Sequence, residues 1–236
     1  AEAHAWSDPS IMGRGKGERS ICNWDEDAVT MGVEAGRDCL SGDAGAIDVV
    51  YFASTTFPFA DRQNAGILTT ALGLGEDVAS VDVTSSQRAG TSALLQALAA
   101  VQSGMYDRAL LVTGDHRRTK AASAGEMAYG DGAAAVLIED TDGVAKFLGG
   151  HTATVDFVDH FRAADQAFDY TWEERWIRDE GLAKIVPPAI GKALAKAGVA
   201  AGDVAHFVMP STIGRAVQGI ARGAGTEVDA AVAAAR

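Results

Sequence analysis

Cysteine is scarce in this chain of 236 residues, which contains two, Cys22 and Cys39. They lie too far apart for a C-x-x-C redox motif and are too few for a zinc cluster or a disulfide framework. The sequence therefore predicts no metal site and no disulfide bonds. So little cysteine is typical of proteins of the reducing cytoplasm, and we expect that location.

Basic side chains are also few, because 20 Lys and Arg residues stand against 32 Asp and Glu residues and leave a formal net charge of −12. This charge opposes binding to phosphate backbones and to anionic lipid surfaces, so we expect neither nucleic acid nor a membrane as a partner. No apolar run approaches the ~20 residues of a membrane-spanning helix, and the chain starts without a charged leader and an apolar signal segment. With 47% hydrophobic and 22% charged residues, the composition is that of an ordinary folded protein.

Hydrophobic periodicity predicts helices and strands in alternation. Helices are expected over residues 25–40, 64–74 and 91–103, and strands over residues 47–54, 78–83, 109–112 and 133–138. The last two strands read as continuous apolar runs, the pattern of strands buried on both faces. Strands that alternate with helices imply right-handed β-α-β crossovers, so the predicted fold class is α/β with layers of helices and sheet.

A weak internal repeat relates residues 47–54 to residues 202–209, which share Asp, Val and Phe at equal positions. Each copy follows an amphipathic helical segment. The repeat predicts that Val49 and Val204 lie on equivalent strands of two related halves. A chance match between α/β elements is the alternative, because three identities in eight positions are weak evidence.

The segment richest in reactive side chains is Val81-Asp-Val-Thr-Ser-Ser-Gln-Arg-Ala-Gly-Thr91, in which a predicted strand passes through hydroxyl groups into a predicted helix. Such a turn presents a side chain at a helix N-terminus, where free N–H groups and the helix dipole stabilise an oxyanion or a bound carbonyl. Thr84, Ser85 and Ser86 also suit the role of helix caps. Spacing alone favours capping over catalysis.

Together with Ala109-Leu-Leu-Val-Thr-Gly-Asp115 and Tyr129-Gly-Asp-Gly-Ala-Ala-Ala-Val136, this segment resembles the thiolase superfamily, in its branch of 3-hydroxy-3-methylglutaryl-CoA synthases and ketoacyl synthases III. The resemblance implies a duplicated fold of α-β-α-β-α layers, which would explain the repeat. Residues 1–150 would form the first half, with the nucleophile elbow, and residues 151–236 an incomplete second half. We expect the chain to lack the family's last strands with their Asn loop, and its first strand.

The resemblance places Gln87 where the family carries its acyl-accepting cysteine, and a carboxamide cannot form a thioester. It places Ser211 where ketoacyl synthases keep a histidine, and Thr55 near the glutamate base of the hydroxymethylglutaryl-CoA synthases. Gln87 and Ser211 are therefore the candidate catalytic residues, and Thr55, Ser86 and Arg88 are candidates for substrate binding. The Gln87 carboxamide can still donate to a thioester carbonyl without covalent chemistry.

Other nucleophiles have little support from the sequence. Five histidines give no Ser-His-acid pattern that spacing reveals, so Ser85 or Ser86 has no evident base. Loading ketosynthase domains with Gln in place of Cys are similar and decarboxylate malonyl groups, but they keep two histidines that Ser211 does not replace.

Two classes of function stay open. One is an enzyme that handles acyl thioesters of coenzyme A or an acyl carrier, in carbon–carbon bond chemistry without a Cys nucleophile; the other is a non-catalytic subunit of a heteromeric acyl-CoA complex. The resemblance implies no cofactor beyond coenzyme A in the substrate. It also implies a homodimer or a heteromer, with a small zinc-ribbon and OB-fold protein as a candidate companion.

Aromatic side chains and both signs of charge are concentrated in residues 168–179. This composition is typical of interface hot spots. The alternative, which we favour, is a helix that packs Trp172 and Trp176 against its own domain.

Overall fold

The computed structural model describes residue 9 and residues 18–43, 45–213, 216–226 and 231–233, in a chain that forms two compact units. The first, called here the sheet unit, consists of Ser20–Arg117 and Gly130–Val144. The second, called here the helical unit, takes its described residues from Ala1–Arg19, Arg118–Tyr129 and Ala145–Arg236. The predicted boundary at residue 150 stays a prediction.

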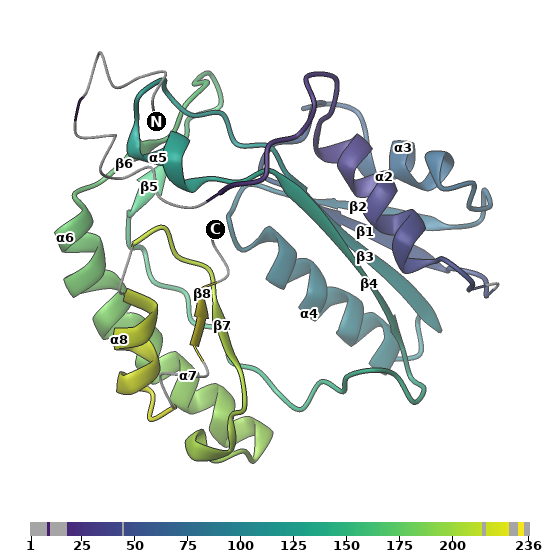
Figure 1. The fold of residues 1–236 in the computed structure, drawn as a ribbon. Helices are drawn as coiled ribbons and strands as arrows, with labels where there is room; N and C mark the ends of the chain where they lie inside the picture. Colours follow the sequence, from purple (N-terminus) through teal and green to yellow (C-terminus); the bar gives the residue numbers. More distant parts are fainter. Residues whose placement is uncertain (1–8, 10–17, 44, 214–215, 227–230, 234–236) are drawn as a thin grey trace. The chain divides into compact units, whose positions relative to one another are not determined.

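The sheet unit has three layers, with helices on both faces of a four-stranded sheet (Figure 1). Its elements are α2 (Ala28–Cys39), β1 (Val49–Ala53), α3 (Asn64–Ala71), β2 (Ala79–Val83), α4 (Ala89–Gln102), β3 (Arg108–Asp115) and β4 (Gly132–Glu139). The strand order is β2-β1-β3-β4. β1 pairs in parallel with β2 and β3, and β3 pairs antiparallel with β4. The predicted α/β class is confirmed.

Alternating side chains of β1 divide the core between the two faces of the sheet, as the twofold period of a strand requires. Val50 and Phe52 pack with α2 and α3, whereas Val49, Tyr51 and Ala53 pack against α4. Every residue of β1 is buried because helices cover both faces. The strand predicted over residues 47–54 is therefore confirmed, and it is buried on both sides.

β4 differs from the prediction in direction and in burial. The alternation of helices and strands predicted parallel crossovers, but β4 runs antiparallel to β3, with Asp115 opposite Gly132. Exposed residues alternate with partly buried ones along β4, and Val136 is 50% exposed. A run of small apolar residues therefore does not by itself show that both faces of a strand are covered, and this part of the prediction is wrong.

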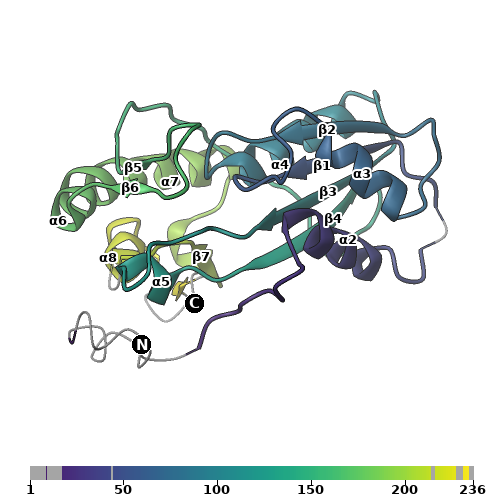
Figure 2. The same cartoon turned by 90° about the horizontal axis from the view of Figure 1, so that it is seen from above.

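α2 begins at a capping box and lies close to the sheet. The Asp27 carboxylate accepts hydrogen bonds from the N–H groups of Val29 and Thr30, and the Thr30 hydroxyl accepts one from the N–H of Asp27. Seen from above, α2 runs along β3 and β4 (Figure 2). At Gly114 of β3, an added Cβ atom would lie 2.8 Å from the carbonyl oxygen of Ala28. The start of α2 therefore packs against a position that has room only for glycine.

An ion-pair cluster lies at the amino-terminal end of β3, around Arg108. The Arg108 guanidinium donates to Asp43 and, at 2.8 Å, to Glu139. Hydrogen bonds from Arg108 and from the backbone N–H of Gly45 hold the pKa of Asp43 below its ordinary value. A hydrogen bond from Thr141 and then one from Arg108 do the same for the pKa of Glu139. At pH values above about 4, the ordinary pKa of a carboxyl group, the two ionised carboxylates therefore stabilise the folded state.

Arg108→Met is expected to destabilise the chain at pH 7 and much less at pH 3. A carboxyl group with a lowered pKa contributes stability above its unfolded pKa and loses it as the pH falls through the folded pKa. Urea unfolding of both proteins at pH 7, 5, 4 and 3 measures the difference. Arg37→Met is the matched control, because the Arg37–Glu34 pair is 58% and 67% exposed and should contribute little at any pH. A difference for Arg108→Met that stays constant down to pH 3 would contradict this explanation.

The helical unit is built from shorter elements. They are α5 (Ala124–Ala128), β5 (His160–Phe161), β6 (Tyr170–Thr171), α6 (Glu174–Trp176), a π-helical segment (Ile177–Leu182), α7 (Ala183–Ala197), a 3-10 turn (Ala201–Asp203), β7 (Phe207–Met209), α8 (Ala216–Gly223) and β8 (Ala231–Ala233). Val204 follows the 3-10 turn and lies outside β7, so its predicted strand position is wrong. The described part of the chain contains no helix with the length and hydrophobicity needed to cross a membrane.

The aromatic segment packs within the helical unit and still faces solvent. Trp176 stacks on Phe157 with ring centroids 4.2 Å apart, and Trp172 lies 6.1 Å from Trp176. Trp172 and Trp176 remain 47% and 37% exposed. Trp176 packs within its own unit as predicted, but Trp172 lies between β6 and α6, so the prediction of one helix that contains both is wrong. The interface interpretation stays a prediction.

Candidate active site

Polar side chains gather at the carboxyl end of the sheet, the region of the sheet unit where β1, β2 and β3 end and β4 begins. Residues 54–56 follow β1, residues 84–88 follow β2, and residues 116–117 follow β3. Because these strands are parallel, their carboxyl ends lie side by side. In open α/β sheets this is where ligands bind.

Asp115, the last residue of β3, organises this region. Its Oδ1 atom accepts hydrogen bonds from the Ser54 hydroxyl at 3.0 Å, the Thr55 N–H at 2.8 Å, the Thr55 hydroxyl at 3.0 Å and the Thr56 hydroxyl at 3.0 Å. The Thr55 hydroxyl also accepts from Arg117 at 2.7 Å. One carboxylate thus fixes the turn that holds the predicted substrate-binding residue Thr55.

Gln87 lies in the turn between β2 and α4, just before the helix begins at Ala89. Its side chain is exposed. Ser85, two residues earlier, has a φ of 69°. This left-handed conformation is uncommon outside glycine and marks a tight turn. The predicted position of Gln87 at the start of a helix is confirmed.

The neighbours of Gln87 stabilise the turn but do not cap the helix. The Ser86 hydroxyl accepts from the N–H of Arg88 at 3.1 Å, and the Ser86 carbonyl accepts from the N–H of Ala89 at 2.8 Å. Arg88 occupies the N-cap of α4, where it makes no side-chain hydrogen bond to the first turn. Capping by Thr84, Ser85 or Ser86, the alternative that spacing favoured, is therefore wrong for this helix.

Ser211 belongs to the helical unit, where it follows β7. Its hydroxyl accepts from the N–H of Ile213 at 3.1 Å, a local turn contact. The structure brings Thr55, Ser86, Gln87 and Arg88 to one end of one sheet. The assignment of Ser211 to the same site stays a prediction.

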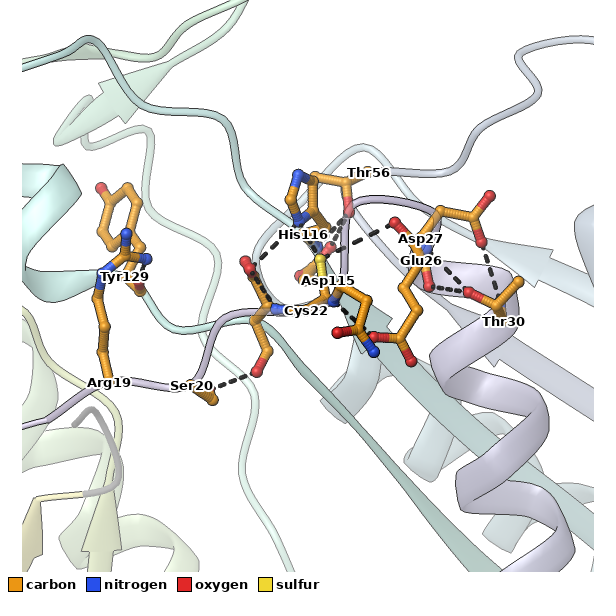
Figure 3. Close-up of polar contacts among 12 residues, drawn as sticks. Arg19, Ser20, Cys22, Glu26, Asp27, Thr30, Thr56, Asp115, His116 and Tyr129 are labelled. Atoms are coloured by element: carbon orange, nitrogen blue, oxygen red, sulfur yellow. Dashed lines mark hydrogen bonds and ion pairs between the residues drawn. The ribbon is translucent and has the colours of Figure 1, made fainter.

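A second cluster at the carboxyl end of the sheet was missed by the sequence analysis. Cys22 Sγ lies 2.9 Å from His116 Nδ1 (Figure 3). The same nitrogen lies 3.3 Å from Asp131 Oδ2. Burial raises the pKa of the Cys22 thiol, and the charge of Asp131 raises it further. The unliganded thiol therefore stays protonated at neutral pH and is not an activated nucleophile.

A hollow of about 640 Å³ lies at the opposite end of the same strands. Residues that precede β1, β2 and β3 line it, among them Ala46, Asp48, Val78 and Met105. The Asp48 carboxylate accepts hydrogen bonds there from the backbone N–H groups of Asp107 and Arg108, each at 2.8 Å. The hollow therefore lies away from Gln87 and Thr55.

A known protein family matches the part of the chain around Gln87. Residues 81–154 match the family model of 3-oxoacyl-[acyl-carrier-protein (ACP)] synthase III. This range begins in β2 and includes α4, β3 and β4.

Two curated relatives are hydroxymethylglutaryl-CoA synthases. That of Thermococcus onnurineus is 32% identical over 150 residues, which are 61% of this chain and 43% of the relative. That of Methanosphaera stadtmanae is 27% identical over 233 residues, which are 96% of this chain and 67% of the relative. The alignment with the first thus spans less than half of its length.

Solved structures share the fold at low sequence identity. A 3-oxoacyl-(acyl carrier protein) synthase III from Pseudomonas aeruginosa PAO1 has a TM-score of 0.82 at 20% identity, over 96% of this chain and 74% of that one. MvaS in complex with 3-hydroxy-3-methylglutaryl coenzyme A has a TM-score of 0.73 at 22% identity, over 93% and 58%. Xanthomonas campestris OleA with bound lauric acid and lauroyl-CoA has a TM-score of 0.79 at 16% identity, over 98% and 79%. The predicted fold is confirmed.

Proposed function

We propose that this chain binds an acyl thioester of coenzyme A or of an acyl carrier. The premise is that it shares the thiolase-like fold and the sequence features of the hydroxymethylglutaryl-CoA synthase and ketoacyl synthase III branch. The thioester lies at the carboxyl end of the sheet. The observation that carries the proposal is the position of Gln87 in the tight turn before α4.

Gln87 acts in this proposal through hydrogen bonds. Its carboxamide has two N–H groups, which can donate to a thioester carbonyl, and the N–H groups of the first turn of α4 and the helix dipole stabilise negative charge on that oxygen. No thiol occupies the position, so no acyl-enzyme forms there. The reaction is then carbon–carbon bond chemistry on a bound thioester, in which Ser86 and Arg88 contact the substrate.

Gln87→Ala is expected to weaken acetyl-CoA binding about 5- to 150-fold, which corresponds to the loss of a hydrogen bond contributing about 1–3 kcal/mol. Isothermal titration calorimetry measures the affinity. Gln96→Ala is the matched control, because Gln96 is an exposed glutamine on α4, the helix that follows Gln87. Equal affinities for the native chain and Gln87→Ala, or an equal loss in Gln96→Ala, would overturn the role of Gln87.

Incubation with radiolabelled acetyl-CoA separates hydrogen bonding from covalent chemistry. The native chain is expected to remain unlabelled after acid precipitation. Label that survives and is mapped by mass spectrometry to Ser85, Ser86 or either cysteine would show a displaced nucleophile and contradict the non-covalent proposal.

The second candidate is a non-catalytic subunit of a heteromeric acyl-CoA complex. It is favoured by the joint occurrence of Gln87, Thr55 and Ser211 at positions where the resemblance expects Cys, Glu and His. In this case the chain binds acetyl-CoA but converts it only when a partner is added. The candidate partners are a second copy of the chain or a small zinc-ribbon and OB-fold protein, in the cytoplasm.

A further inference from the structure

Three potential metal ligands from separate parts of the chain meet at the carboxyl end of the sheet. Cys22 lies before α2, His116 follows β3 and Asp131 precedes β4. One ligand atom from each lies within 4.8 Å of the others. The Asp131 side chain is 6% exposed, whereas His116 is 39% exposed, so the cluster is enclosed on one side and open on the other.

The contacts in this cluster place one ring nitrogen between a sulfur and a carboxylate. His116 Nδ1 faces both the Cys22 sulfur at 2.9 Å and the Asp131 carboxylate at 3.3 Å. In a neutral imidazole this nitrogen either donates one hydrogen or accepts one. If it accepts from the thiol, its lone pair faces a carboxylate, and if it donates, two acceptors share one hydrogen. A cation between the three atoms would satisfy all of them.

The donor set and its spacing fit zinc. Thiolate, imidazole and carboxylate are the groups that bind Zn²⁺ in proteins, and three protein ligands with an open fourth position are typical of reactive sites. In tetrahedral coordination with ordinary bond lengths, nitrogen and oxygen ligands lie about 3.3 Å apart, and sulfur and nitrogen about 3.6 Å apart. The nitrogen and oxygen already have this spacing, and a small rotation of the Cys22 side chain supplies the rest.

Hydrogen bonds hold the three residues in place. The N–H of Cys22 donates to Asp131 Oδ2 at 3.1 Å. The backbone N–H of His116 donates to the Thr56 hydroxyl at 2.9 Å, and that hydroxyl donates to Asp115. Ser20 pairs with the backbone of Asp131 through its hydroxyl and its carbonyl. The bond from Cys22 to the Asp131 carboxylate is of the kind found in metal sites, where hydrogen bonds orient ligating carboxylates.

We propose that Cys22, His116 and Asp131 bind one Zn²⁺ ion, with the fourth position open to water. The thiol proton of Cys22 passes to solvent when the ion binds. The ion joins the segment before α2 to β3 and β4. This site goes beyond the proposed acyl-thioester function and does not depend on it.

The test is a titration of the full metal-free chain with Co²⁺ alone, followed by displacement with Zn²⁺. The expected result is one Co²⁺ per chain, with near-ultraviolet thiolate-to-cobalt charge transfer and intense visible bands of tetrahedral cobalt. Cys22→Ser is expected to abolish the charge-transfer band, and His116→Gln to weaken Zn²⁺ binding more than about 10-fold, since even residues that only support a ligand cost that much. Cys39→Ser is the matched control and should change neither, because Cys39 lies on α2 outside the cluster.

Absence of charge transfer in the native chain, its persistence in Cys22→Ser, or its loss in Cys39→Ser would overturn the proposal. Far-ultraviolet circular dichroism of each variant shows whether it folds, and His116→Gln tests the site even if Cys22→Ser does not fold. Acetyl-CoA affinity measured on the same samples reports the proposed function separately.

Discussion

Asp115→Ala is expected to lower the free energy of unfolding by about 2–4 kcal/mol, because a carboxylate that accepts four hydrogen bonds is removed and its donors lose their common partner. Hydrogen bonds to a charged group contribute about 1.5–3 kcal/mol each, and partial exposure lets water replace part of this network. Urea unfolding followed by circular dichroism measures the change.

Asp107→Ala is the matched control for Asp115→Ala. Asp107 lies just before the other end of β3 and is exposed, so its replacement should change the free energy of unfolding by less than about 0.5 kcal/mol. If both variants unfold at the same urea concentration as the native chain, Asp115 does not organise the residues after β1.

Phe52→Ala is expected to lower the free energy of unfolding by about 3–5 kcal/mol, the usual cost of removing a buried aromatic ring. Phe52 is fully buried in β1, and its ring meets that of Phe57 edge-on with centroids 4.9 Å apart. Gly32 of α2 lies so close that an added Cβ would be 3.2 Å from the Phe52 ring, which indicates dense packing around it.

Phe59→Ala provides the comparison for Phe52→Ala, since Phe59 is 42% exposed and should cost less than about 1 kcal/mol. Chemical unfolding of both variants under the same conditions gives the difference. Equal losses for the two phenylalanines would show that the core formed by β1, α2 and α3 is not the main source of stability.

The elements of the sheet unit could be predicted from sequence because each has a local signal. The helix expected over residues 25–40 is α2, and the strand expected over residues 47–54 is β1. Asp27 gives the start of α2 directly, since its carboxylate caps the helix. The direction of β4 has no such signal, because a strand's sequence does not record whether its neighbour is parallel or antiparallel.

The candidate site was predictable only where one short segment contains it. The strand, turn and helix around Gln87 are contiguous, so a motif could identify the turn. The Asp115 network joins residues about 60 positions apart, and the Cys22 cluster joins segments about 110 positions apart. Residues brought together by strand pairing have no fixed spacing along the chain, which is why neither cluster could be found before the fold was known.

The distance along the chain between Cys22 and Asp131 also has a consequence for biosynthesis. The N–H of Cys22 bonds to a carboxylate 109 residues later. At translation rates of about 5–20 residues per second, the ribosome reaches Asp131 about 5–20 s after Cys22. During that interval the nascent thiol has no Asp131 beside it, and it is open to oxidants that the finished fold partly excludes. The cluster therefore cannot form before almost the whole sheet unit, which ends at Val144, has been synthesised.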